Sequence, residues 1–168
     1  MGKMLKVGAM LLFFSVIAFN AQAQKFGYVN SADILASLPE VKQADASLDA
    51  LQKQLQKKGQ GMVDQLQQDY LAVQQKVERG DLSPKQQEEE AGKLKNREGE
   101  ISKFEQDMMK QLQDKRNELL EPIYKKVNDA IAAVAKENGY QFIFEKSVLL
   151  YFEETQDVSS MVKSKLGI

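Results

Sequence analysis

The sequence predicts an α+β protein that is mostly α-helical, with a long antiparallel helical hairpin arm projecting from a small β-rich oligomerisation body. Residues 40–138 indicate the arm, because apolar side chains recur there at helical spacing among many charged and amide residues. A glycine and a capping sequence near residues 80–84 divide this pattern into two helices. Residues 24–39 and 139–168 indicate the body, because both contain short runs typical of strands.

The first 23 residues have the pattern of an export signal. Lys3 and Lys6 precede an apolar run of thirteen residues, 7–19, and Ala21-Gln22-Ala23 matches a small-residue cleavage site. We therefore expect residues 1–23 to be a signal peptide that is cleaved after Ala23. The alternative is an uncleaved membrane anchor, for which the apolar run is short.

The body begins with a predicted strand over residues 25–29. Asn30 or Ser31 then suits the cap of a short helix that runs through Leu35. Pro39 suits the first turn of the outgoing arm helix, because proline has no amide hydrogen to donate.

Each arm helix carries one apolar stripe, which is enough to pair the two helices and little more. The outgoing stripe consists of Leu48, Leu51, Leu55, Met62, Leu66, Tyr70, Val73 and Val77. The returning stripe consists of Ile101, Phe104, Met108, Leu112, Leu119, Ile123, Val127, Ile131 and Val134.

The arm tip has both a stop signal and a start signal. Gly80 suits a left-handed helix end, and Ser83-Pro84-Lys85-Gln86 suits a capping box with proline at the first helical position. A turn this short predicts two antiparallel neighbours.

After the arm we expect two strands and a closing helix. Gly139 ends the returning helix, and residues 140–145 alternate as a strand does. Residues 148–152 are apolar on both faces, which predicts a second strand. Asp157 or Ser159 suits the cap of a last short helix.

Three residues interrupt the arm helices. Pro122 predicts a kink or a new segment, where the arm meets the body. Gly59 and Gly61 favour either a hinge or a close approach of the partner helix.

The composition gives no support for catalysis, so we predict no enzyme and no catalytic, cofactor-binding or metal-binding residues. The chain has no histidine and no cysteine, which are the commonest ligands of transition metals. Its formal net charge is −1, and both signs are interleaved along the arm. Without a basic stripe, nucleic acid is not expected as a partner.

The body is too small for a robust core of its own, and its strands would leave open edges. Association of several copies through their strands would solve both problems. The candidate residues of that interface are aromatic or aliphatic: Tyr28, Phe142, Phe144, Leu150 and Phe152. This argument leaves the number of copies open.

The chain resembles the OmpH/Skp family of periplasmic chaperones over nearly all of its length after residue 23. The resemblance rests on the order and spacing of segments 26–30, 38–42, 120–123, 139–144 and 157–166 around a long arm. It implies a homotrimer in the periplasm whose arms hold unfolded outer-membrane proteins without ATP. The best-known members are strongly basic, so the mild acidity of this chain gives no support for contact with membrane or lipopolysaccharide.

Clients of such a chaperone would be held by many weak apolar contacts. The candidate residues are apolar arm residues beyond those needed to pair the helices: Met62, Tyr70, Phe104, Met108 and Met109. Methionine suits this role because it repacks against varied partners. The alternative is ordinary packing between the two arm helices, to which Met109 is the clearest exception because Met108 already occupies the stripe. The alternative function is a periplasmic coiled-coil spacer or adaptor. A prefoldin-like holdase would work by a similar mechanism, but the export signal argues against a cytosolic chaperone.

Overall fold

The computed structural model describes residues 24–168, so the predicted signal peptide lies outside the described residues. The backbone separates into two compact units. We call residues 35–126 the hairpin unit, and residues 24–34 with 127–168 the strand unit.

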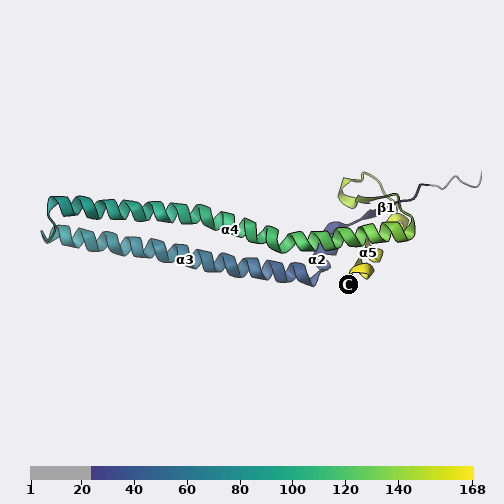
Figure 1. The fold of residues 1–168 in the computed structure, drawn as a ribbon, viewed down its shortest axis with the longest axis horizontal. Helices are drawn as coiled ribbons and strands as arrows, with labels where there is room; N and C mark the ends of the chain where they lie inside the picture. Colours follow the sequence, from purple (N-terminus) through teal and green to yellow (C-terminus); the bar gives the residue numbers. More distant parts are fainter. Residues whose placement is uncertain (1–23) are drawn as a thin grey trace, which may run out of the picture. The chain divides into compact units, whose positions relative to one another are not determined.

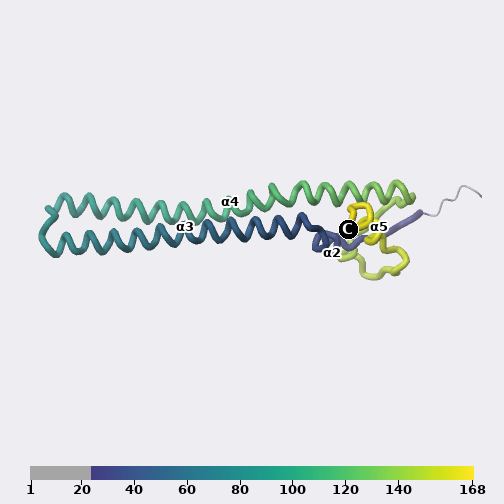
Figure 2. The backbone as a smooth tube through the Cα atoms, turned by 90° about the horizontal axis from the view of Figure 1, so that it is seen from below, coloured from purple at the N-terminus to yellow at the C-terminus, as the bar shows by residue number. Residues whose placement is uncertain are grey.

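The hairpin unit is built from two long helices. Helix α3 spans Pro39–Glu78 and has its proline in the first turn, as the sequence predicts. Helix α4 spans Pro84–Asn138, and its last residues belong to the strand unit. Figures 1 and 2 show α3 and α4 side by side from two perpendicular directions. The predicted antiparallel hairpin and the mostly helical α+β class are confirmed.

The tip between α3 and α4 follows the predicted capping chemistry. Gly80 has a φ of 74°, and its N–H donates to the carbonyl of Val77. The Ser83 N–H donates to Gln86 Oε1 at 2.9 Å, while the Gln86 N–H donates back to Ser83 Oγ at 3.4 Å. These bonds satisfy backbone groups that a helix end would otherwise leave free.

The stripes of α3 and α4 form a thin core in the hairpin unit. The buried apolar residues of this unit are Leu38, which precedes α3, and Ala44, Leu55, Leu94 and Ile123. Leu94 is absent from the predicted stripe, although it lies seven residues before Ile101. Tyr70 and Val77, which the predicted stripe includes, are exposed instead of buried.

Pro122 lies inside α4 and does not begin a new segment. The rest of the helix forms around it, since one proline removes only one backbone donor from the helical ladder.

The strand unit contains a two-stranded parallel sheet. Strand β1 spans Phe26–Val29 and strand β2 spans Phe142–Glu145, with Phe26 opposite Phe142 and Val29 opposite Glu145. Both strands were predicted, and β2 begins two residues later than expected. They are parallel because a long helical connection separates them in the chain. Buried residues around them come from three helices and a loop: Ile34, Val127, Ala130, Val134, Val158 and Val162.

The predicted strand over residues 148–152 is wrong. Lys146–Val148 forms a 3₁₀ turn (η2), and the Leu149 N–H donates to the carbonyl of Lys146. The turn carries this run away from the ladder, so it pairs with neither strand. The free side of β1 is bridged by Asp157 instead, opposite Tyr28.

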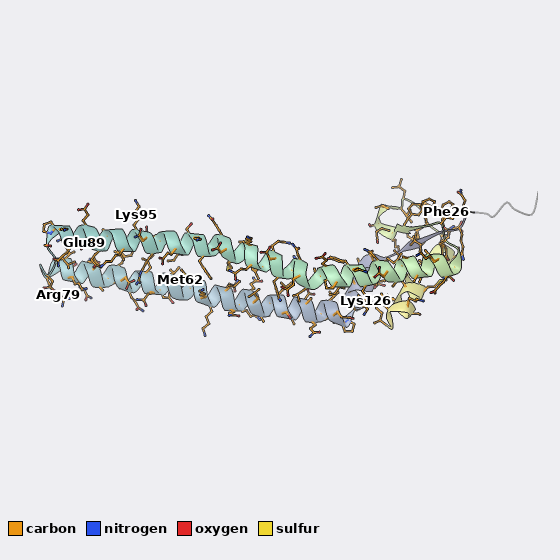
Figure 3. All side chains as sticks on the ribbon, viewed as in Figure 1. Phe26, Met62, Arg79, Glu89, Lys95 and Lys126 are labelled. Atoms are coloured by element: carbon orange, nitrogen blue, oxygen red, sulfur yellow. The ribbon has the colours of Figure 1, made fainter. Side chains whose placement is uncertain are left out.

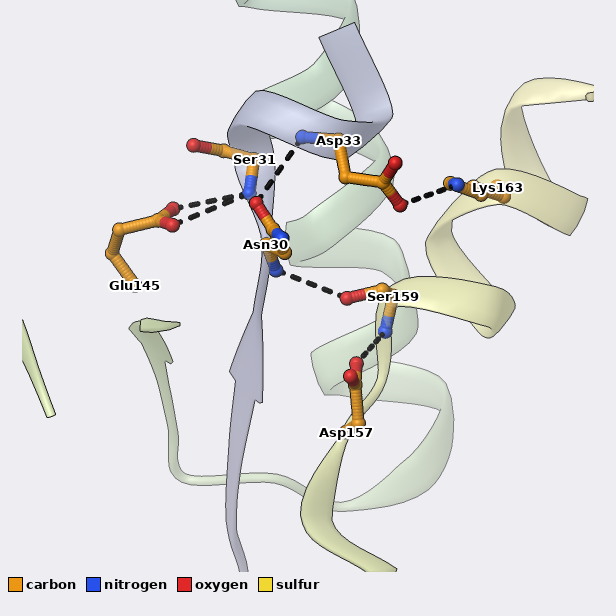
Figure 4. A network of polar contacts seen from close by, with 7 residues as sticks. All are labelled: Asn30, Ser31, Asp33, Glu145, Asp157, Ser159 and Lys163. Atoms are coloured by element: carbon orange, nitrogen blue, oxygen red, sulfur yellow. Dashed lines mark hydrogen bonds and ion pairs between the residues drawn. The ribbon is translucent and has the colours of Figure 1, made fainter. Parts of the chain in front are cut away.

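Polar contacts join the short elements of the strand unit (Figure 4). Asn30 Oδ1 accepts the Asp33 N–H at 3.1 Å, and so caps α2, Ser31–Ser37. The Asn30 N–H donates to Ser159 Oγ at 3.0 Å, at the start of α5, Ser159–Leu166. The cap position of α5 is Val158, and Asp157 accepts the Ser159 N–H at 2.8 Å. Asp33 on α2 also pairs with Lys163 on α5 at 2.6 Å.

Replacing Gly80 with alanine should lower the free energy of unfolding by about 1 kcal/mol, because a Cβ strains a residue held at positive φ. Gly92 is the matched control, since it lies inside α4 at ordinary helical φ and a Cβ there would meet no heavy atom within 4 Å. Gly92→Ala should raise the free energy of unfolding by about 0.5–1 kcal/mol. Urea unfolding measures both, and an unchanged midpoint for Gly80→Ala would contradict the strained tip.

Candidate interaction surfaces

The five candidate contact residues of the hairpin unit differ in exposure. Met62, Phe104 and Met108 are half-buried in the stripe. Tyr70 is 45% exposed and Met109 is 69% exposed. The structure therefore brings three of them into helix packing and leaves two accessible, while the role of all five remains a prediction. Val63 and Leu71 are also exposed on α3, and the prediction did not include them. Both are apolar residues outside the predicted stripe, which is the sequence feature that indicates an exposed apolar side chain.

A groove of about 370 Å³ lies along the hairpin unit beside Met62, which Figure 3 labels. We call it the Gly61 groove. Residues of both helices line it: Lys58, Gly61, Met62, Gln65, Arg97, Glu100 and Ile101. Met62 and Ile101 are its apolar, half-buried members, and the charged side chains surround them.

A second groove of about 420 Å³ lies beside Met109, and we call it the Met109 groove. Its lining combines apolar and charged side chains: Asp45, Leu48, Asp49, Gln52, Met109, Leu112, Gln113 and Arg116. Two candidate contact residues thus adjoin open grooves, one near the middle of α3 and the other along α4.

Polar contacts cross between α3 and α4 where the stripe is thin. Arg97 forms an ion pair with Asp69, and the Tyr70 hydroxyl donates to Glu98 Oε1 at 2.7 Å. These two adjacent links fix the register of the helices near the tip, since each pairs a residue of α3 with one of α4. The hydrogen bond to Glu98 and partial burial raise the pKa of Tyr70 above its ordinary value.

The two glycines of α3 differ in their surroundings. A Cβ on Gly59 would lie 3.3 Å from the Phe104 ring, whereas a Cβ on Gly61 would meet nothing within 4 Å. Close approach of the partner helix therefore accounts for Gly59 and does not account for Gly61.

The strand unit exposes an apolar patch of aromatic and aliphatic side chains. Phe26, Phe142 and Phe144 lie with their ring centroids 6.0–6.4 Å apart, and all three rings are partly exposed. Val148, Leu150 and Tyr151 are largely or fully exposed in the segment that follows β2. We call these six residues the strand-unit patch.

The candidate interface residues divide across this patch. Phe142, Phe144 and Leu150 belong to it. Tyr28 is buried inside the chain, and its ring lies 4.9 Å from that of Phe152, which is half-buried. The sequence prediction of the interface did not include Phe26, Val148 and Tyr151. Val148 and Tyr151 belong to the apolar run 148–152, which the sequence shows.

Within residues 24–168 no helix is both long and apolar enough to span a membrane. The same residues contain no group of three or more histidine, cysteine, aspartate or glutamate side chains placed to hold a metal ion.

These features define a class of protein: a helical hairpin with apolar grooves, joined in one chain to a small sheet that has an exposed aromatic patch. The chain belongs to the OmpH-like outer membrane protein family, whose family model matches residues 25–166.

Two relatives and one solved structure are similar to most of the chain. A protein named Chaperone protein Skp from Yersinia enterocolitica is 27% identical over 152 residues, which cover 85% of this chain and 86% of that protein. Another of the same name, from Vibrio cholerae serotype O1, is 27% identical over 166 residues, which cover 95% and 94% of the two chains. A crystal structure described as that of a putative OmpH-like outer membrane chaperone from Caulobacter crescentus matches with a TM-score of 0.74. It shares 16% identity over 88% of this chain and 86% of that one, which shows a common fold.

Alanine at Gly61 should raise the free energy of unfolding by up to about 1 kcal/mol, because helix propensity improves and nothing is displaced. Gly59→Ala should raise the free energy of unfolding by less, because the Phe104 ring must shift to make room for the new Cβ. Thermal and urea unfolding of the two variants check this difference. Equal gains would show that the Phe104 ring moves freely.

The raised pKa of Tyr70 predicts a pH dependence. The neutral Tyr70 hydroxyl is favoured in the folded state, so its contribution to stability is complete below the unfolded pKa of about 10. That contribution is lost as the pH rises through the higher pKa of the folded state. The stability difference between the unsubstituted protein and Tyr70→Phe should therefore shrink between about pH 9 and pH 12. Burial also raises the pKa of Tyr28, but Tyr28 titrates in both proteins and its effect cancels. A constant difference would contradict the hydrogen bond to Glu98.

Proposed function

We propose that this protein is a periplasmic chaperone that holds unfolded outer-membrane proteins and keeps them from aggregating without ATP. The observation that carries the proposal is membership of the OmpH-like family across residues 25–166. Relatives named as Skp chaperones, similar over 85% and 95% of the chain, support the same function. The absence of histidine and cysteine favours a binding protein over an enzyme.

Clients would be held by many weak contacts along the hairpin unit. Exposed Met109 and Tyr70, and Met62 beside its groove, offer adaptable apolar surface at separate points. Methionine has three flexible torsions and a polarisable sulfur, so it packs against varied partners. Separate weak sites let a client exchange between contacts while its own apolar segments stay covered.

The assembled form would be a homotrimer joined through the strand-unit patch. A two-stranded sheet is marginal on its own, and an unpaired strand edge promotes association. Exposed aromatic rings beside such an edge are typical of self-association surfaces. The interface residues that we propose are Phe142, Phe144 and Leu150. Tyr28 and Phe152, whose rings pack against each other, would support the interface from within the chain.

The periplasm is the compartment that the predicted signal peptide and the relatives favour. Near-balanced charge along α3 and α4 gives little long-range attraction, so client binding should depend only weakly on salt. We propose no contact with nucleic acid, membrane or lipopolysaccharide.

The proposal is tested by diluting an unfolded outer-membrane β-barrel from urea into buffer with the mature protein and no nucleotide. We expect light scattering to fall nearly to background at about one trimer per client, and native mass spectrometry to show a discrete complex. A stable oligomer that leaves aggregation unchanged would contradict the chaperone function and favour the spacer or adaptor.

The variant Leu150→Asp tests the role of the strand-unit patch in the same assay. A charge at this fully exposed position should reduce the native mass to that of single chains and weaken suppression at least tenfold. Leu71→Asp is the matched control, because Leu71 is half exposed on α3 and lies outside the patch. It should keep the oligomer mass. An unchanged mass for Leu150→Asp would remove the patch from the interface.

A further inference from the structure

The Gly61 groove combines two chemical features that suit one kind of side chain. Methionine contributes to its apolar surface through Met62, and two cations, Lys58 and Arg97, stand at its rim. We propose that this groove binds aromatic side chains of unfolded clients. This inference rests on the proposed chaperone function and assigns a ligand class to one surface of it.

Neither the backbone conformation nor the packing of the two helices explains why residue 61 is glycine. Gly61 is not among the described glycines with positive φ, and a Cβ there would meet nothing within 4 Å. Glycine weakens a helix interior relative to alanine, so the residue stabilises neither α3 nor its packing. Because Gly61 has no side chain, it leaves one wall of the groove open beside Met62. Gly92 and Gly99 are equally free of contacts, but they line neither groove and serve as comparisons.

The rim cations favour aromatic rings over aliphatic side chains. A ring presents a negative face, which attracts an ammonium or guanidinium group within about 6 Å. Lys58 already lies over an aromatic ring in this way, with its Nζ 5.0 Å from the centroid of Phe104. A thioether such as that of Met62 also packs favourably against ring edges. Because Lys58 is already engaged with Phe104, Arg97 is the cation left for a client ring, and its planar guanidinium can stack on a ring while its edge pairs with Asp69. Arg97 and Met62 therefore supply two contacts that an aliphatic side chain cannot use.

The charges of the rim argue against a free anion as the ligand. Arg97 is paired with Asp69, and Glu100 stands on the same rim, so the positive charge is largely balanced. The Met109 groove has the opposite balance of charge, since its lining contains two carboxylates, Asp45 and Asp49, and one cation, Arg116. The Gly61 groove contains two cations and one carboxylate. Carboxylates repel the negative face of a ring, so we assign the aromatic side chain to the Gly61 groove alone.

Unfolded outer-membrane barrels supply this ligand in quantity. Their strands carry girdles of aromatic residues at both membrane interfaces, and these rings are exposed until the barrel forms. The groove volume of about 370 Å³ leaves room for a large ring. Each hairpin unit would thus hold an extended client segment through one aromatic anchor.

The test uses the assembled mature protein and a short unstructured peptide with one tryptophan. Because this chain contains no tryptophan, fluorescence reports the peptide alone. Gly61→Gln fills the open wall with a good helix former, and Gly99→Gln makes the same change on α4 away from the groove. We expect Gly61→Gln to weaken peptide binding at least threefold and Gly99→Gln to leave it unchanged. The same peptide with leucine in place of tryptophan should compete poorly against the unsubstituted protein.

Circular dichroism and native mass accompany these measurements. Equal peptide affinity of Gly61→Gln and the unsubstituted protein, with helicity retained, would overturn the assignment. So would a change in native mass caused by Gly61→Gln, because the groove would then be covered by a second copy of the chain. Suppression of barrel aggregation by the unsubstituted protein is measured separately. If suppression is present while the peptide result is negative, the groove assignment fails and the chaperone function stands.

Discussion

The narrow apolar stripe shared by α3 and α4 is the constraint on which the rest of the hairpin unit depends. Its buried side chains are Ala44 and Leu55 on α3, and Leu94 and Ile123 on α4. One stripe per helix buries little surface, and long isolated helices gain most of their stability from such packing. The Asp69–Arg97 ion pair and the Tyr70–Glu98 hydrogen bond add register where apolar contact is thin.

The same thin stripe leaves apolar groups available for binding. A wider core would cover Met62 completely, and Met109 would not remain 69% exposed. The grooves beside these two methionines are open, and residues of both helices line them. Under the proposed function, each open groove would bind a client weakly, and repeated weak contacts would suit clients that differ in sequence.

The strand unit has a small buried core, but its sheet has only two strands. Val158 and Val162 are fully buried, and the Asn30–Ser159 hydrogen bond ties β1 to α5. Strand β2 nevertheless has a free edge within the described chain, and Leu150 and Tyr151, which follow it, are exposed. A second copy of the chain is the partner that completes such a sheet in the proposed trimer.

The sequence by itself determined the elements whose signals are local. Gly80 and the Ser83–Gln86 capping box set the tip, and Pro39 set the start of α3, because helix ends depend on residues within one turn. Tertiary structure decided the features that depend on register between distant segments. Only the pairing of α3 with α4 placed Gly59 against Phe104 and Asp69 beside Arg97. Likewise, the apolar run 148–152 has the composition of a strand, but the 3₁₀ turn Lys146–Val148 leads it away from the free edge of β2. Within one chain, Asp157 takes the free side of β1 instead.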